Sequence, residues 1–86
     1  MNKIIFRIVE TEVELQQCFS VRHSVFVEEQ RIFFETDQDE FDKNAIHIAA
    51  IDTNTGKVVS TVRCHEKKSG IWYGARLAVA KEFRTH

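Results

Sequence analysis

The sequence has no proline, only three glycines and only two cysteines among its 86 residues. Without proline, and with so little glycine, no segment has the composition of a linker, so we expect one domain over residues 1–86. The two cysteines, Cys18 and Cys64, do not form a C-x-x-C pair, which argues against a metal or dithiol redox motif. We expect free thiols in a reducing compartment, with a single disulfide as the alternative.

The sequence also lacks an excess of charge of either sign: 12 Lys and Arg residues stand against 13 Asp and Glu residues, for a formal net charge of -1. Nucleic acids and anionic membranes select basic surfaces, so we expect neither as the main partner. No apolar run has the length of a membrane span. The N-terminus does not have the pattern of a signal peptide, because Arg7 and Glu10 interrupt it and no cleavage site follows. These absences predict a cytoplasmic protein.

A strand and a helix are predicted first along the chain. The β-branched run at residues 3–9 indicates a strand. Thr11 and Glu14 have the spacing of a capping box, with Thr11 at the N-cap, and predict a helix that runs to about Glu29. The apolar positions of this helix recur at steps of three and four residues, as the buried face of an amphipathic helix requires. They are Leu15, Cys18, Phe19, Val25 and Phe26.

The rest of the chain predicts an acidic segment followed by three antiparallel strands. Residues 31–44 are acidic but contain three phenylalanines, which indicates a short helix or an ordered loop. Apolar and β-branched runs at 45–52, 57–66 and 71–79 predict a three-strand meander, with the first turn at 53–56, which ends in Gly56, and the second turn at 67–70. The first of these strands is almost entirely apolar, so we expect it to be covered on both faces.

The last predicted strand lies at the edge of the sheet. Large apolar side chains on an open edge favour unwanted strand pairing, so we expect a further element or a partner to cover them. These side chains are Ile71, Trp72, Tyr73 and Leu77.

Five segments together resemble the N-terminal half of the GNAT superfamily of N-acetyltransferases. The most specific is Arg76-Leu77-Ala78-Val79, which Arg84 follows five residues later. In that family this strand leads into an arginine- or glutamine-led, glycine-rich turn that opens the cofactor-binding helix, and residues 84–86 would be the first three of that turn. We therefore expect the sequence to stop at the start of that helix. The five segments are VRHSVFVEEQ (21–30), Asp37-x-Asp39-x-x-Asp42, AIHIAAID (45–52), VVSTVRC (58–64) and WYGARLAVAKEFRTH (72–86).

The resemblance implies an α+β fold, the N-terminal half of an acyl-CoA N-acyltransferase domain. Its elements would be a strand, a helix, a short helix or loop, and a three-strand antiparallel meander. It also implies acetyl-CoA as co-substrate and an amine of a small molecule as acceptor. Within the superfamily, the chain is most similar to a bacterial subgroup associated with nitrogen starvation. Because the glycines of the turn would follow His86, we do not expect residues 1–86 to be active alone.

The resemblance further assigns the residues that bind the cofactor. In the family, free backbone groups of the last strand pair with the pantetheine arm like an added strand, and one N–H stabilises the thioester oxyanion. Unpaired N–H groups at the helix N-terminus bind the pyrophosphate. No catalytic residue is assigned, because Glu28 and Tyr73 are candidates for proton transfer by residue type only. The cofactor-binding residues are Leu77, Ala78, Val79, Arg84, Thr85 and His86.

Arg22 interrupts the apolar face of the predicted helix. A buried guanidinium needs an acidic partner, so one interpretation is an ion pair with the aspartates of the acidic segment, which would pin that segment to the helix. The other interpretation is a role in substrate binding, in which Phe26 and Arg63 would share. The candidate substrate-binding residues are therefore Arg22, Phe26 and Arg63.

We expect no metal site. The three aspartates begin like a calcium loop, but the sixth position is Asp42 where glycine is needed, and the twelfth is Ile48 where glutamate is needed. The four histidines do not have the spacing of a ligand cluster.

Two alternatives to an acetyltransferase stay open. Acyl-homoserine-lactone synthases share this half-fold, and Arg22, Phe26, Arg63 and the acidic segment are similar to residues of that family as well. There the acyl donor is usually an acyl carrier protein and the amine is S-adenosylmethionine. The other alternative is a non-catalytic half domain that forms a homodimer through its exposed last strand.

Overall fold

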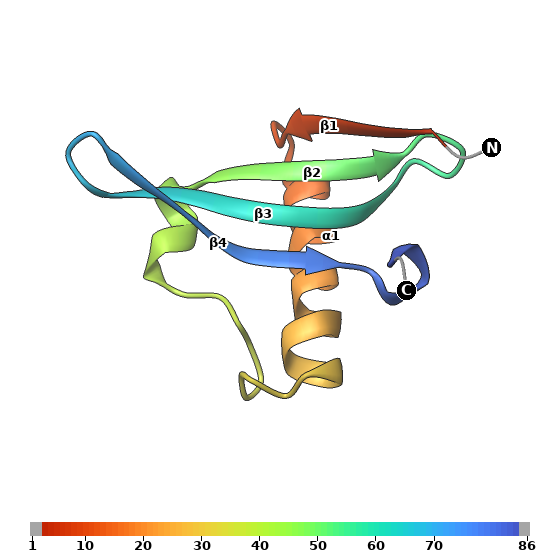
Figure 1. Ribbon diagram of the computed structural model, residues 1–86, viewed down its shortest axis with the longest axis horizontal. Coiled ribbons are helices and arrows are strands. Elements are labelled where there is room, and N and C mark those ends of the chain that lie inside the picture. Colours follow the sequence, from red (N-terminus) through yellow and green to blue (C-terminus); the bar gives the residue numbers. More distant parts are fainter. Residues whose placement is uncertain (1–2, 85–86) are drawn as a thin grey trace.

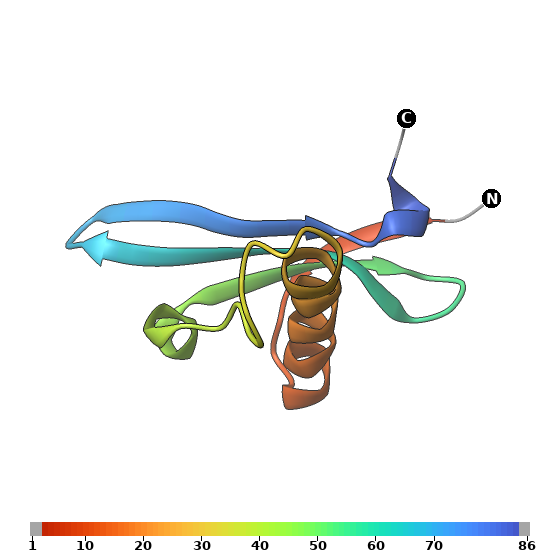
Figure 2. The same cartoon turned by 90° about the horizontal axis from the view of Figure 1, so that it is seen from below.

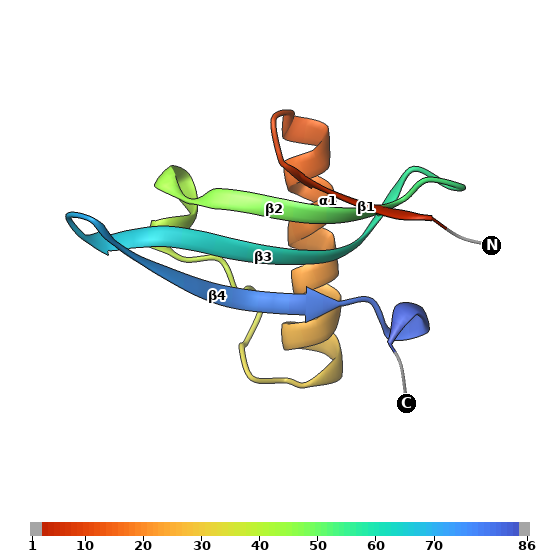
Figure 3. The same ribbon diagram turned by 45° about the horizontal axis from the view of Figure 1, so that its top comes forward.

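Four strands form one antiparallel sheet in the order β1-β2-β3-β4 (Figure 1). The structure is a computed structural model that describes residues 3–84. Helix α1 lies against one face of the sheet in Figure 2, and Figure 3 shows it crossing behind the strands. This arrangement confirms the predicted α+β fold and the meander, to which β1 adds a fourth strand beside β2. The elements are β1 (Ile4–Ile8), α1 (Glu12–Arg22), η1 (His23–Glu29), η2 (Glu40–Asn44), β2 (Ile46–Asp52), β3 (Lys57–Lys68), β4 (Ile71–Val79) and η3 (Lys81–Phe83).

The predicted cap begins α1. Thr11 is the N-cap residue, and its hydroxyl oxygen accepts a hydrogen bond from the Glu14 backbone N–H at 3.2 Å. This bond satisfies one of the free N–H groups of the first turn. The Glu14 carboxylate forms an ion pair with Arg7 of β1, so it ties the helix start to the neighbouring strand.

The helix ends at Glu29, where the sequence predicts its end, but its last part has a different geometry. From His23 to Glu29 the chain forms a π-helix, η1, in continuation of α1. The Gln30 N–H accordingly donates to the Val25 carbonyl five residues back, at 2.8 Å. A π-helical turn is wider than an α-helical one, and such turns occur often at functional sites.

The hydrophobic core lies between α1 and the sheet. Cys18 of α1 is fully buried and packs against three sheet residues, Ala49, Ile51 and Val58. Both cysteines are free, as predicted, and burial raises the pKa of the Cys18 thiol. Such a thiol stays protonated and serves as a small hydrophobic side chain. Ile5, Val9 and Val21 border this core.

The prediction that β2 is covered on both faces is confirmed only in part within residues 3–84: Ala49, Ala50 and Ile51 are each at most 5% exposed, but a helix covers only one face of the sheet. The side chains that pack on α1 come from one face, and no helix of residues 3–84 covers the other. On the uncovered face, Phe6 is 74% exposed and Ile8 is 56% exposed. An all-apolar strand indicates burial, but its sequence does not say what provides it.

The turn between β3 and β4 is also shorter than predicted. β3 continues through Lys68, two residues beyond the predicted end, so the turn is formed by Ser69 and Gly70. Gly70 has a φ of 79°, a conformation that favours glycine and suits a two-residue hairpin turn. The Glu66 carboxylate accepts a hydrogen bond from the Gly70 N–H at 2.9 Å and so stabilises this turn.

Candidate functional site

Strand β4 forms an open edge of the sheet, as the sequence predicts, because it pairs with β3 on one side only. The Ala80 N–H donates to the Val59 carbonyl at 2.8 Å, and Ala78 lies opposite Thr61. Backbone groups alternate in direction along a strand, so the N–H and C=O of Val79 point away from β3. The end of β4 therefore offers the Val79 N–H at the open edge, where the Val79 C=O already accepts a hydrogen bond from Arg84.

A bulge bends β4 shortly before Val79. Thr61 pairs with Ala78 and Arg63 pairs with Ala75, so Arg76 and Leu77 together lie opposite one residue of β3. Arg76 has a φ of 55°, in the left-handed region that is uncommon for a residue with a side chain. Bulges re-aim strands and are frequent beside active sites.

Arg84 joins the end of β4 to the end of η1. Its Nε donates to the Val79 carbonyl at 3.0 Å, and its Nη1 donates to Glu29 Oε2 at 2.7 Å. A second contact, from Arg84 Nη2 to Glu29 Oε1, completes a bidentate pair. Hydrogen bonding to Arg84 lowers the pKa of the Glu29 carboxyl. The structure thus brings Leu77, Ala78, Val79 and Arg84 together, whereas Thr85 and His86 lie outside the described residues.

Six charged side chains form a second feature, which we call the charge cluster. At its centre, Arg22 is fully buried. Its Nε donates to Asp37 Oδ2 at 2.7 Å, and its Nη1 and Nη2 donate to the two carboxylate oxygens of Asp42 at 2.7 and 3.1 Å. This geometry confirms the predicted ion pair between the helix and the acidic segment. The cluster consists of Arg22, Arg63, Arg76, Asp37, Asp39 and Asp42.

Two arginines of the sheet complete the charge cluster. Arg63 Nη1 donates to Asp39 Oδ1 at 2.6 Å and lies 3.3 Å from Asp42 Oδ2. Arg76 Nη2 donates to Asp39 Oδ2 at 3.1 Å, and Arg76 Nε donates to the Asp37 carbonyl at 3.0 Å. Three positive and three negative charges balance one another, so the cluster can be buried without an unpaired charge. The sequence did not predict that Arg76 belongs to the charge cluster. The apolar pattern of a strand does not reveal a bulge, and here the bulge turns the Arg76 side chain toward the acidic segment.

The charge cluster shifts the pKa values of two of its members, Asp42 and Arg22. Burial raises the pKa of Asp42, but hydrogen bonds from Arg22 and the Asp39 N–H, with the charges of Arg22 and Arg63, outweigh it and lower that pKa to about 2. Burial also opposes the charge of Arg22, yet its hydrogen bonds to Asp42 and Asp37 raise its pKa. Asp42 and Arg22 therefore stay ionised at neutral pH, and their ion pair holds the acidic segment against α1.

The low pKa of Asp42 predicts a loss of stability in acid. The folded pKa of about 2 lies below the ordinary 3.8, so the stabilisation is complete above about pH 4 and is lost as the pH falls toward 2. The pKa difference corresponds to about 2 kcal/mol of unfolding free energy. We expect urea unfolding of the wild type to show this loss, whereas Asp42→Asn should be less stable at pH 7 but lose less between pH 4 and pH 2. Equal losses for both proteins would contradict it.

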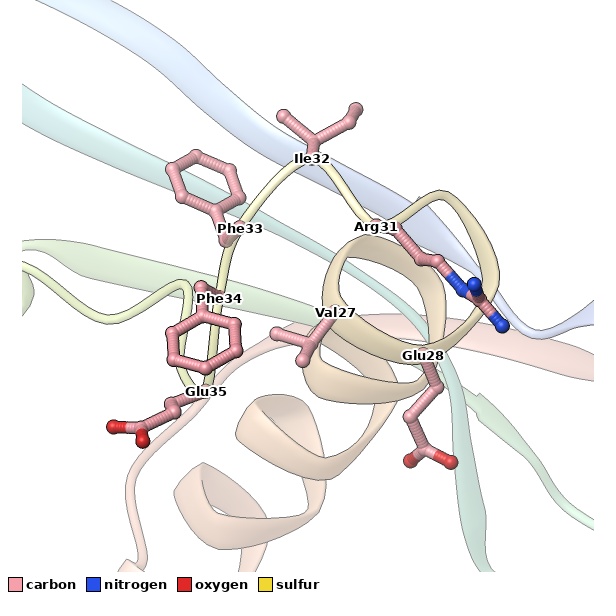
Figure 4. Close-up of a pocket in the computed structure, with 7 residues that line it drawn as sticks. All are labelled: Val27, Glu28, Arg31, Ile32, Phe33, Phe34 and Glu35. Atoms are coloured by element: carbon pink, nitrogen blue, oxygen red, sulfur yellow. The ribbon is translucent and has the colours of Figure 1, made fainter.

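A cavity of about 580 Å³ lies where η1 meets the acidic segment (Figure 4). In Figure 4, Phe33 and Phe34 lie along the loop on one side, while Glu28 and Arg31 lie by the helix end. Arg31 and Glu35 have φ values of 55° and 66°, and such strained residues cluster at ligand sites. The lining residues are Val27, Glu28, Arg31, Ile32, Phe33, Phe34 and Glu35. No sequence motif indicated this cavity, because the loop conformation creates it.

The cavity adjoins β4 through one contact. The Arg76 guanidinium lies over the Phe33 ring, 4.2 Å from its centroid. Phe26 meets the same Phe33 ring edge to face, with 6.3 Å between centroids. Of the two residues considered for proton transfer, Glu28 lines this cavity, whereas Tyr73 stacks on His65 elsewhere, 6.3 Å between centroids.

Within residues 3–84, no group of three or more His, Cys, Asp or Glu side chains has an arrangement that could hold a metal ion. Over the same range, no helix is both long and apolar enough to cross a membrane. His47 of β2 and His65 of β3 contact different residues. His47 Nε2 lies 3.1 Å from the Asp42 carbonyl oxygen, and the His65 ring stacks on Phe41.

Comparison with known protein families agrees with the geometry of β4 and its following segment. The family model described as an acetyltransferase (GNAT) domain matches residues 21–86. The match includes the charge cluster, the bulged strand and Arg84, and it covers well over half of the chain. This chain therefore belongs to the GNAT family of acetyltransferases.

Proposed function

We propose that this domain binds acetyl-CoA along the open edge of β4 and transfers the acetyl group to an amine of a small molecule. The observation that carries the proposal is the edge-facing backbone of Val79, directly after the bulge at Arg76. An extended pantetheine arm can pair with such an edge as an added strand would. The proposed cofactor contacts are Leu77, Ala78, Val79, Arg84, Thr85 and His86.

The proposed reaction is a direct attack of the amine on the thioester. The amine nitrogen forms a bond to the acetyl carbon, the C–S bond breaks, CoA leaves as the thiol, and the amine loses one proton. A backbone N–H at the edge of β4 stabilises the oxyanion that develops on the carbonyl. The nitrogen must lose its proton for the amide to form, and the general base is not assigned.

We propose that the acceptor enters the cavity at the end of η1. The contact between Phe33 of the cavity and Arg76 of the bulge supports this, because it places the cavity beside the proposed cofactor strand. Arg22 and Arg63 would then serve substrate binding by holding the acidic segment in place, since both are buried in the charge cluster. Phe26 would support the Phe33 ring.

The test uses the full-length protein in two measurements. Calorimetric titration with acetyl-CoA should give saturable binding, and release of CoA thiol should depend on an added amine from a panel of small molecules. Binding of an acyl carrier protein and S-adenosylmethionine, without binding of acetyl-CoA, would favour a lactone synthase instead. No binding of acetyl-CoA by the full-length protein would contradict the proposal.

The similarity to the subgroup associated with nitrogen starvation stays a prediction. We also propose a cytoplasmic location, because both cysteines are free thiols.

A second proposal concerns self-association through β4. Leu77 is 66% exposed on this open edge strand, which a second copy of the chain would cover when acetyl-CoA does not occupy it. Light scattering should show a concentration-dependent dimer that Leu77→Lys abolishes. Val13→Lys is the matched control, because Val13 is 68% exposed on α1 and the same charge is introduced there. A wild-type protein that stays monomeric at every concentration would contradict the homodimer.

A further inference from the structure

A second cavity, of about 320 Å³, lies between η2 and the β3–β4 hairpin. It shares no lining residue with the cavity at the end of η1. Two carboxylates, Glu40 and Glu66, line it, and its lining includes neither lysine nor arginine. The complete lining consists of Glu40, Phe41, Asn44, His65, Glu66 and Trp72. We propose that this cavity binds an organic ammonium ion.

The aromatic side chains around this cavity are already ordered by an aromatic stack. Phe41 stacks on His65 with 4.5 Å between centroids, and His65 stacks in turn on Tyr73. A cation caps each end of this array: the Arg63 guanidinium lies 5.9 Å from the Phe41 ring and the Lys67 ammonium lies 5.3 Å from the Tyr73 ring. Lys67 thus contacts Tyr73, and neither of these two residues lines the cavity.

Trp72 is the aromatic side chain that remains available. Its side chain is 51% exposed, and it makes no ring or cation contact with any residue from 3 to 84. Indole is the aromatic ring that attracts cations most strongly.

The two carboxylates and the Trp72 indole ring together indicate the chemical class of the ligand. One oxygen of Glu66 accepts the Gly70 N–H, while the Glu40 carboxylate forms no hydrogen bond or ion pair with residues 3–84. A carboxylate beside an open indole face attracts a cation with an apolar surface more than a neutral molecule of the same shape. An alkylammonium or a quaternary ammonium ion meets both requirements. The proposal does not depend on acetyl transfer.

Trp72 provides the readout, because it is the single tryptophan of the chain. We expect choline to change Trp72 emission saturably at millimolar concentration, with ionic strength held constant by sodium chloride. The neutral isostere 3,3-dimethyl-1-butanol should not do so. Glu40→Gln should weaken choline binding at least fivefold, whereas Glu10→Gln, an equal charge change at an exposed residue outside the cavity, should leave it unchanged.

Three results would overturn the ammonium site: no saturable change with choline, an equal change with the alcohol, or choline binding by Glu40→Gln equal to that of the wild type. Circular dichroism of each variant confirms that the fold is retained, and Glu40 is an exposed residue whose replacement unpairs no buried charge. Ligand-observed NMR with Trp72→Ala provides a second measurement, in which choline should lose its contact with the protein.

Discussion

Arg22→Met should unfold this domain or bring it close to unfolding. The substitution leaves the carboxylates of Asp37 and Asp42 buried without their main partner, since both bind the fully buried Arg22 guanidinium. Breaking a buried ion pair on one side costs about 3–5 kcal/mol. A small domain has a total stability of about 5 kcal/mol or somewhat more, so little would remain. Urea unfolding followed by circular dichroism measures the loss.

A matched substitution separates burial from simple loss of charge. Arg7→Met also removes a guanidinium from an ion pair, but the Arg7 side chain is 55% exposed, and exposed pairs contribute only about 0–1 kcal/mol. The triple variant Arg22→Met, Asp37→Asn, Asp42→Asn should recover part of the stability that Arg22→Met loses, because it removes the unpaired carboxylates. A loss of less than about 1 kcal/mol for Arg22→Met would show that the charge cluster does not hold the acidic segment.

The second large effect is expected from Val79→Pro in the full-length protein. Proline removes a backbone N–H, and at Val79 that N–H faces the open edge, so no bond to β3 is lost. We expect the fold to persist while acetyl transfer decreases by roughly 10²–10³-fold, the usual effect of deleting one oxyanion donor. Initial rates of CoA thiol release, with circular dichroism as a check on folding, provide the measurement.

Val79→Ala is the control for this experiment, because it truncates the side chain and keeps the N–H. If Val79→Pro and Val79→Ala had the same rate, the edge-facing N–H of Val79 would have no part in the reaction. If the two variants differed in their affinity for acetyl-CoA but not in their rate at saturation, the N–H would bind the pantetheine arm without stabilising the transition state.

Local signals in the sequence were sufficient for most of the secondary structure. Thr11 predicted the start of α1 because N-capping depends on a single side chain and the N–H groups of the next turn. The strands followed from β-branched runs, and the turn at Gly56, with a φ of 73°, followed from its glycine. The burial of Arg22 could also be inferred, since a charged residue on an apolar helix face requires a nearby carboxylate.

The parts that could not be predicted depend on contacts between distant segments. The conformation of Arg76, with its φ of 55°, is set by a bulge against β3 and by Asp39 of the loop, and neither is visible in the strand's own sequence. The acidic segment showed which residues could pair, but not that Asp39 would bind the two sheet arginines rather than Arg22. The exposed face around Phe6 was missed because an apolar strand does not identify what covers it.

Amide hydrogen exchange of the full-length protein, with and without acetyl-CoA, tests the central claim most directly. The sheet has two edge strands, β4 and β1, so the amides of β1 serve as the control for those of β4. If acetyl-CoA lies along β4, the amide of Val79 should become protected while the amides of Ile4–Ile8 exchange at an unchanged rate. Protection at β1, or saturable binding that leaves the Val79 amide unprotected, would contradict the proposed cofactor site.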